Sequence, residues 1–276
     1  MTPRSRTRLL CAAIFAMALT LFSSASGGAE PAPGEEPKPG KIAAKSGGKN
    51  VKLPGMVINF RERCVDIESA ICLDRGFLEL IACTKDSKEH ESIVAVTARP
   101  MHIHAALLLL GANNGNPAMR KVVGEQKKRW INVPPKGDPV DVYLVFKNSD
   151  GKMVEHPISD FVSRSGKSPD EQDDADGGDA KKDVKFPSTF LFAGSHLRGA
   201  GPGPRKYLAD QSGNVISIVT FGDELLCLPG VYAKGNDSLM WQVDARKLPK
   251  VGSKVTLRLR PQVKPAPKTG KTLPEK

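Results

Sequence analysis

A cluster of potential ligands lies between residues 88 and 111, in the sequence KEHESIVAVTARPMHIHAALLLLG. It contains three of the five histidines of the chain and two glutamates. Imidazole nitrogens and carboxylate oxygens bind Zn²⁺ and related divalent metals, and both groups can also transfer protons. The cluster therefore raises two alternatives: a metal or catalytic site, or a packed helix with polar ends.

His90, Glu91 and His104 are the candidate metal ligands or catalytic groups. A strand expected over 91–98 separates the first two from His104, and a strand of about seven residues extends roughly 23 Å. We therefore expect the two groups at opposite ends of this strand unless the chain bends back. His102 and His104 are two residues apart, and residues so spaced do not share a helix face. His104 is either a ligand or a hydrogen-bonded histidine of the core.

Other catalytic patterns are weak in this sequence. Ser195 and His196 are adjacent, an arrangement in which the imidazole rarely reaches the hydroxyl, and there is no G-x-S-x-G elbow. There is no dinucleotide-binding fingerprint and no C-x-x-C motif. Without clustered cysteines we expect no iron–sulfur cluster. The sequence does not identify a cofactor, and a divalent metal is the one candidate that the histidines and glutamates raise. The sequence thus favours a protein that is not an enzyme.

An apolar helix and several strands must position these residues. Pro100 suits a first helical turn, MHIHAALLLL follows it, and Gly111 stands where a helix would end. The run from Ala105 to Leu110 has no polar side, which predicts burial against a sheet. Leu108→Ala should then cost about 2 to 5 kcal/mol. Strand patterns over 65–73 and 77–84, separated by Asp-Arg-Gly, predict a hairpin.

The second half of the chain repeats this plan. Strand patterns over 189–195 and 214–221 precede ELLCLPG, a short apolar run that takes the place of the first helix. Gly137 and Gly252 each begin the pattern G-x-x-V-x-[VL]-x-L, a strand with one buried face. We therefore expect an α+β, β-rich fold. Two similar β-β-α-β units, arising by internal duplication, would pack as one domain with short buried helices on a sheet.

The N-terminus resembles a secretory signal. Arg4, Arg6 and Arg8 precede an apolar run over 9–22, which is too short to span a bilayer, and small residues follow. The sequence therefore predicts an exported protein, periplasmic or extracellular, without a transmembrane segment once the signal is removed.

The rest of the chain divides by composition. The expected organisation is a signal peptide at 1–29, a disordered Pro/Gly/Lys-rich spacer at 30–54, a folded α+β domain at 55–262 and a disordered basic tail at 263–276. Within the domain, halves at about 63–147 and 186–262 are separated by a flexible acidic insertion at 164–185.

The formal charge of +11 lies mainly in the two ends. Residues 1–54 hold eight Lys or Arg against three acids, and residues 261–276 hold four against one, which leaves +3 for the residues between them. A nucleic-acid-binding domain carries a basic face within its fold, so we expect no nucleic-acid partner. The basic stretch from Arg120 to Arg129 contains Glu125 and resembles a solvated loop. The basic tails predict only a weak, salt-sensitive attraction to anionic surfaces.

Four cysteines follow the signal: Cys64, Cys72, Cys83 and Cys227. In an oxidising compartment disulfides persist, and four cysteines allow three pairings that the sequence does not distinguish. The alternative is that they are free and serve as small apolar side chains.

Several separated blocks also resemble one known family. In order they are KEHESIVAV, HAALLLLG, WxxVPPKG, FLFAGS, YLADQSGNVISIVTF and VTLRLRP, and together they resemble the YdjY-like domain of bacterial exported proteins over nearly all of residues 63–262. The family has no established activity. The resemblance implies that His90, Glu91 and His104 belong to the family pattern, whether they bind a ligand or only pack.

Two functions from different classes follow. The first is a non-enzymatic exported module that binds an unidentified component of the cell envelope. The second is a metal-binding protein or metal-dependent enzyme that uses His90, Glu91 and His104 around a divalent metal. The positions of these three side chains distinguish the two.

Overall fold

A computed structural model of the protein describes residues 50–124, 129–164, 185–199, 203–233 and 241–262. The predicted signal peptide at 1–29 and basic tail at 263–276 lie outside these residues, as do residues 30–49 of the expected spacer and 165–184 of the expected insertion. The last residues of that spacer, Val51–Leu53, form strand β1, because they pair with β2 (Met56–Asn59).

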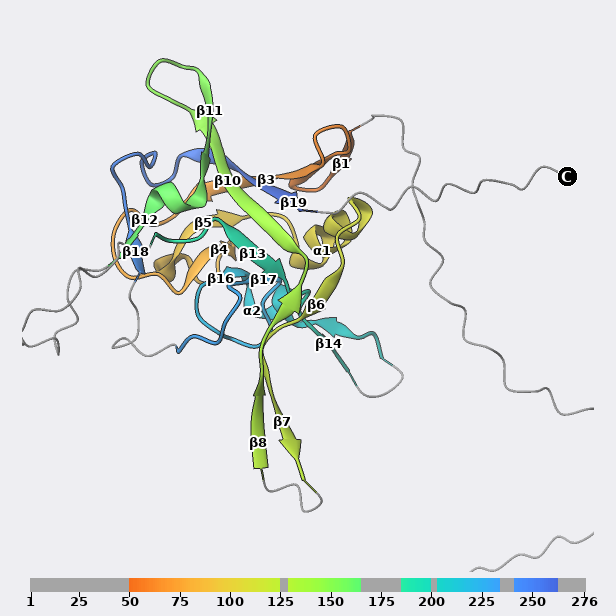
Figure 1. Cartoon of the computed structure of the whole chain (residues 1–276). Coiled ribbons are helices and arrows are strands. Elements are labelled where there is room, and N and C mark those ends of the chain that lie inside the picture. The colour runs from red at the N-terminus through yellow and green to blue at the C-terminus, as the bar shows by residue number, and fades with distance from the viewer. Residues whose placement is uncertain (1–49, 125–128, 165–184, 200–202, 234–240, 263–276) are drawn as a thin grey trace, which may run out of the picture. The chain divides into compact units, whose positions relative to one another are not determined.

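Eight strands form a closed mixed β-barrel (Figure 1). In order around the ring they are β3 (Cys64–Ile71), β19 (Lys254–Pro261), β10 (Pro139–Lys147), β13 (Thr189–Phe192), β17 (Leu226–Cys227), β16 (Asn214–Ser217), β4 (Leu80–Thr84) and β5 (Ser92–Val96). Pairing of β5 with β3 closes the ring. The pairs β4/β5 and β16/β17 are parallel and the other pairs are antiparallel. The β-rich character predicted from the sequence is confirmed.

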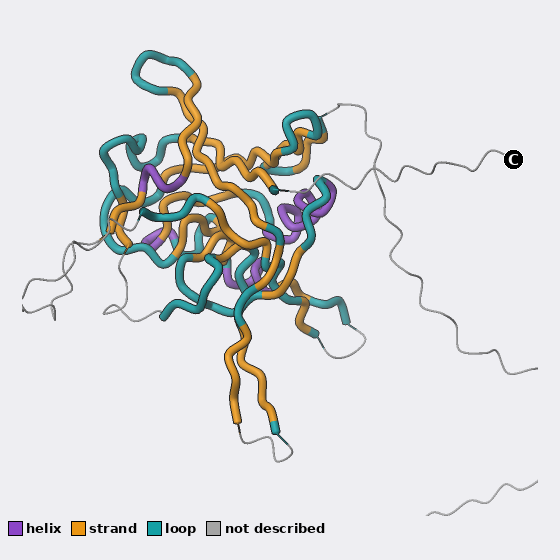
Figure 2. Tube along the Cα trace, in the orientation of Figure 1, coloured by secondary structure: helices purple, strands orange, loops and turns teal. Residues whose placement is uncertain are grey.

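Shorter elements surround the barrel (Figure 2). Strand β2 extends the sheet beside β3, and β11 (Met153–Pro157) extends it beside β10. Four two-stranded ladders join β6 (Asn114–Asn116) to β9 (Lys136–Gly137), β7 (Met119–Val123) to β8 (Arg129–Val133), β12 (Val162–Arg164) to β18 (Trp241–Val243) and β14 (Leu197–Arg198) to β15 (Lys206–Tyr207). The described helices are α1 (Pro100–Leu109), α2 (Leu208–Ser212) and the 3₁₀ turns η1 (Glu89–Glu91) and η2 (Ile158–Phe161).

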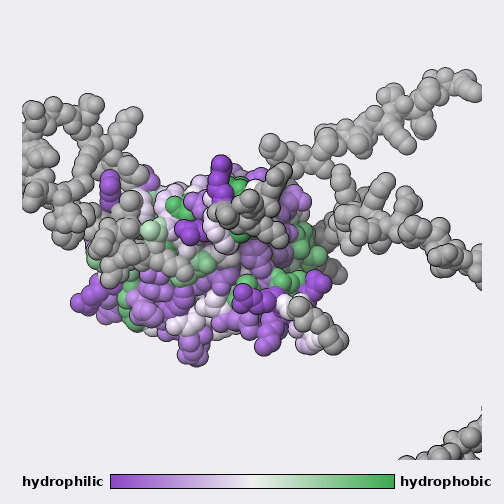
Figure 3. All heavy atoms as spheres, turned by 90° about the horizontal axis from the view of Figure 1, so that it is seen from below, coloured by the Kyte–Doolittle hydropathy of each residue, from purple (hydrophilic) through white to green (hydrophobic). Residues whose placement is uncertain are grey.

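Alternating side chains determine which face of each barrel strand is buried. In β19, Val255, Leu257 and Leu259 are buried in the core, whereas Thr256 and Arg258 point outward and are partly exposed. Successive side chains of a strand point to opposite faces, so the G-x-x-V-x-[VL]-x-L pattern predicted this strand and β10 correctly. Figure 3 shows that hydrophilic residues cover most of one surface, with apolar residues in smaller patches.

Helix α1 is confirmed, but it is buried on one side only. Ile103, Ala106 and Leu107 are fully buried, whereas Leu108 is 45% exposed and Leu109 is 52% exposed. The prediction that the run from Ala105 to Leu110 is buried against a sheet, with Leu108 in the core, was wrong for Leu108 and Leu109, because the helix lies against the barrel along one face only. Its apolar composition does not reveal which side is covered. No described helix is long and apolar enough to cross a membrane.

Leu107→Ala, rather than Leu108→Ala, should therefore destabilise the domain. Leu107 has no exposed surface, so its truncation leaves a cavity and is expected to cost about 2 to 5 kcal/mol. Leu108→Ala is the matched control on the same helix and should change the free energy of unfolding by less than about 1 kcal/mol. Urea denaturation of both variants tests this. If both variants lost the same free energy of unfolding, the one-sided packing of α1 would be contradicted.

The hairpin predicted from 65–73 and 77–84 is not formed. Strand β5 lies between β3 and β4, with Ala95 opposite both Ala70 of β3 and Cys83 of β4. The Asp-Arg-Gly sequence turns the chain, but the strands that it joins are separated by one that comes later in the sequence. Turn residues report a local reversal and not the partner of a strand.

The helix predicted in ELLCLPG was also wrong. Leu226–Cys227 form strand β17, which pairs with β13 and β16. A short apolar run does not distinguish a buried helix from a buried strand. The second helix, α2, instead precedes β16 and ends at Gly213, whose φ of 79° is left-handed. The structure therefore does not show the predicted duplication of two β-β-α-β units.

Candidate functional site

Two of the residues selected from the sequence lie together in the turn η1. His90 Nε2 is 3.7 Å from Glu91 Oε2, and Lys88 Nζ is 3.7 Å from Glu91 Oε1. The His90 side chain is 78% exposed, whereas that of Glu91 is 18% exposed. Glu91 therefore has Lys88 as a cationic partner at the start of its turn, with the His90 imidazole beside it.

His104 lies in a separate buried network. Its Nδ1 is 2.8 Å from the Tyr207 hydroxyl, which in turn donates to the carbonyl of Gly194 over 2.8 Å. Because this hydroxyl proton points to Gly194, His104 donates from Nδ1 and its Nε2 is unprotonated. The Phe192 ring meets the imidazole edge-on at 4.9 Å. Burial lowers the pKa of His104, so the ring is neutral at pH 7.

The structure thus brings His90 and Glu91 together and places His104 with Tyr207. Within the described ranges, no group of three or more His, Cys, Asp or Glu side chains is arranged to hold a metal ion. The use of His90, Glu91 and His104 around a divalent metal stays a prediction. Tyr207 is 103 residues from His104 in the sequence, and no pattern near either residue indicated their contact.

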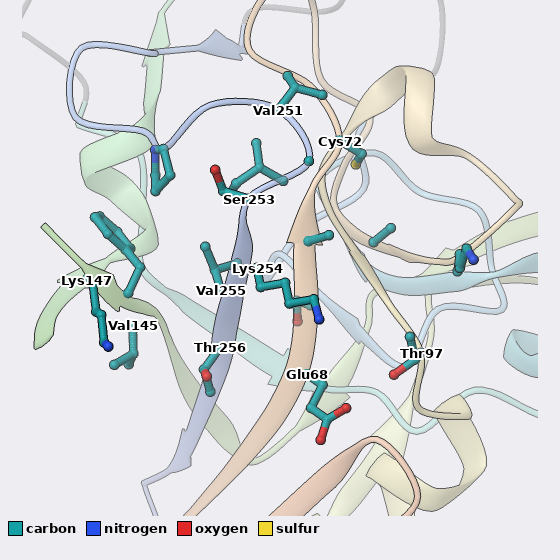
Figure 4. A pocket seen from close by; sticks show the side chains of 18 of the residues that line it. Glu68, Cys72, Thr97, Val145, Lys147, Val251, Ser253, Lys254, Val255 and Thr256 are labelled. Atoms are coloured by element: carbon teal, nitrogen blue, oxygen red, sulfur yellow. The ribbon is translucent and has the colours of Figure 1, made fainter. Parts of the chain in front are cut away.

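A groove of about 1010 Å³ lies on the outer face of the barrel (Figure 4). Its size is at the upper end of the range usual for small-molecule sites. Figure 4 shows Lys147 at one end, Lys254 and Glu68 near the middle, and Thr97 toward the other end. The groove was not predicted from the sequence. The residues that form the groove are the outward-pointing side chains of strands that lie far apart in the sequence. The sequence of one strand does not show which other strands lie beside it.

Strand register places the floor of the groove. Val145 of β10 lies opposite Thr256 of β19, and Thr256 lies opposite Glu68 of β3. In the next row, Lys254 lies opposite Ala70, which lies opposite Ala95 of β5. The small side chains of the two alanines leave the face hollow at this point. Glu68 and Lys254 stand over a floor in which Ala70, Ala95 and Val145 are apolar and Thr256 is polar.

The exposed charged side chains around this floor have no partners among the described residues. Lys85, Lys147, Lys254 and Glu68 line the groove, and all four are exposed. None of their side chains makes a hydrogen bond or ion pair with another described residue. Glu89, also in the lining, accepts a hydrogen bond from the Asp86 backbone at 2.9 Å. The groove therefore offers three free cations and one free carboxylate.

The neighbouring half of the same face is neutralised internally. Arg258 donates to both carboxylate oxygens of Asp66, at 2.6 and 2.8 Å, and to Glu155 at 2.7 Å. Arg260 also pairs with Glu155 and lies 5.1 Å from the centre of the Tyr143 ring. Hydrogen bonding to Asp66 raises the pKa of Arg258. On this face of the sheet, the charges without described partners thus lie in the half that forms the groove.

One thiol, that of Cys72, lies at one end of the groove, and Cys83 is buried in β4. Cys72 lines the groove and donates to the Ser92 carbonyl at 3.1 Å. Hydrogen bonding from Cys72, with further hydrogen bonds from Ser92 and Ser87, lowers the pKa of Cys83. Burial raises the pKa values of Cys64 and Cys227. All four cysteines are free in this structure, as one of the two alternatives from the sequence expected.

Comparison with known proteins identifies one relationship. A family model for the YdjY domain matches residues 56–260, which is more than half of the chain. No curated protein and no solved structure matches the chain.

Proposed function

Because the chain belongs to the YdjY domain family, which brings no activity with it, we propose a function from the site alone: an exported module that binds a ligand in the barrel groove. Export is supported by the arginines and apolar run within residues 1–29. The ligand would then be a component of the cell envelope.

The proposed ligand is an anionic amphiphile, with an apolar chain and a carboxylate or phosphate group. The apolar chain would lie on the floor made by Ala70, Ala95 and Val145. The anionic group would lie between Lys147 and Lys254. The observation that carries the proposal is the contrast across one sheet face, where Arg258 is paired with carboxylates but the lysines of the groove are not.

Charge also predicts a limit on affinity. Glu68 carries a free carboxylate over the same floor, so it opposes an anionic group at the middle of the groove. The head group should therefore lie toward Lys147, on the far side of Lys254 from Glu68. Glu68→Gln is expected to strengthen binding of an anionic amphiphile at low ionic strength.

Calorimetric titration of the mature chain with three twelve-carbon amphiphiles tests this function. Dodecanoate and dodecyl phosphate should bind with one site per chain, whereas dodecyltrimethylammonium should bind at least tenfold more weakly. Comparing the affinities for dodecanoate and dodecyl phosphate shows which of the two head groups, carboxylate or phosphate, the groove prefers. Equal binding of the cationic amphiphile would show that only apolar contact matters, and no saturable binding of any of the three would refute the proposal.

A further inference from the structure

The β7/β8 hairpin carries features that the groove does not use. Among the described residues, these strands pair only with each other, and the hairpin extends away from the barrel (Figure 1). An isolated two-stranded hairpin is marginally stable in water. Even so, this hairpin exposes apolar side chains: Trp130 is 63% exposed, and Val122 and Ile131 are each 37% exposed.

Register places these side chains toward the outer part of the hairpin. Val122 lies opposite Trp130, and Ile131 lies opposite Lys121. Tryptophan combines a large apolar ring with an N–H donor, which suits a boundary between water and hydrocarbon. Val122 shares the face of Trp130, whereas Ile131 lies on the opposite face, so both faces of the outer part of the hairpin carry apolar side chains.

The hairpin is also strongly cationic. Its two strands hold Arg120, Lys121 and Arg129 and contain no acidic residue. None of the three cations has a side-chain partner among the described residues. Alternating cations and apolar residues on a projecting element match the composition of segments that lie on anionic lipid surfaces.

A second apolar patch lies at the base of the hairpin. Val231 is 53% exposed and Tyr232 is 40% exposed. Together with Met119, Arg120 and Asn132 they line a small cavity between the hairpin and the segment after β17. A second exposed aromatic residue therefore lies at the base of the hairpin, beyond the polar pair Arg120 and Asn132.

We propose that the β7/β8 hairpin docks the domain on the surface of an anionic lipid bilayer. Trp130, Val122 and Ile131 enter the boundary between head groups and acyl chains, and Arg120, Lys121 and Arg129 contact lipid phosphates. A single-stranded nucleic acid would also attract the cations, but stacking on successive bases needs a series of aromatic side chains. The described hairpin has one aromatic residue and two aliphatic ones, which favours lipid. This proposal does not depend on a ligand in the barrel groove.

The two tryptophans of the chain provide the test. Trp241 is buried, whereas Trp130 is exposed, so the full chain with Trp241→Phe reports on Trp130 alone. Vesicles of phosphatidylglycerol and phosphatidylethanolamine should shift its emission to shorter wavelength, and phosphatidylcholine vesicles should not. Co-sedimentation with the anionic vesicles should fall at least tenfold in the double variant R120E/K121E.

The β14/β15 hairpin supplies a matched control. It carries exposed Arg198 and Lys206 beside Leu197, which is 56% exposed, but no exposed aromatic residue. The double variant R198E/K206E makes the same change of charge and should retain vesicle binding.

An equal loss of vesicle binding in both double variants would show attraction by net charge alone and would overturn the proposal. If the chain binds vesicles but the emission of Trp130 does not shift, the basic N- and C-terminal segments and not the hairpin would hold the membrane. That result would also overturn the proposal. Binding to a single-stranded oligonucleotide that quenches Trp130, without a vesicle shift, would replace lipid with nucleic acid as the partner.

Discussion

Ala70→Trp should reduce the affinity of the barrel groove for dodecanoate by a hundredfold or more, equivalent to about 2.7 kcal/mol. Ala70 lies on the floor between Lys254 and Ala95, and its side chain points outward into the hollow. An indole ring at this position would fill the space that the apolar chain of the ligand occupies. The same titration calorimetry measures the loss.

A substitution on the same sheet face controls for the added bulk. Val57 of β2 lies opposite Asp66, beside the neutralised half of the face and outside the groove. Val57→Trp should leave dodecanoate binding within about twofold of the unaltered chain. If Ala70→Trp bound dodecanoate as well as Val57→Trp does, the groove would not be the binding site. Melting curves of both variants establish that each is folded.

Arg258→Ala should cause a large loss of stability, about 2 to 4 kcal/mol. The Arg258 side chain is 16% exposed, and its removal leaves Asp66 and Glu155 facing each other without their shared cation. Partly buried carboxylates that lose a cation keep their desolvation cost and gain mutual repulsion. Urea denaturation at constant salt measures the change.

Arg260→Ala serves as the comparison on the same strand. Arg260 is twice as exposed, at 32%, and shares only Glu155, so its loss should cost about 1 kcal/mol or less. Adding Asp66→Asn to Arg258→Ala should restore part of the stability, because it removes one of the stranded charges. A cost for Arg258→Ala no greater than that for Arg260→Ala would show that the network does not stabilise the barrel.

The sequence revealed local structure well because local structure depends on neighbouring residues. The alternation of Val255, Leu257 and Leu259 predicted β19, and the interval from Pro100 to Gly111 predicted α1. The family resemblance over residues 63–262 was confirmed by the match over residues 56–260. In each case the signal lies within a short continuous segment.

Features made by distant segments were missed for the same reason. The groove floor joins residues of β10, β19, β3 and β5, and nothing in any one strand indicates the other three. Spacing predicted that His104 lies apart from His90 and Glu91, but it could not identify Tyr207 as the partner of His104. The helix expected in ELLCLPG failed because strand pairing from β13 and β16 determines its conformation.

The position of β19 in the ring affects how the chain can fold. This strand is the last described element of the barrel, yet it lies between β3 and β10, which both come well before it in the sequence. Until it emerges from the ribosome, both of those strands keep an unpaired edge and the ring stays open. Such non-local closure is intrinsically slow. A nascent chain that cannot complete its barrel early therefore stays incompletely folded until synthesis is nearly finished.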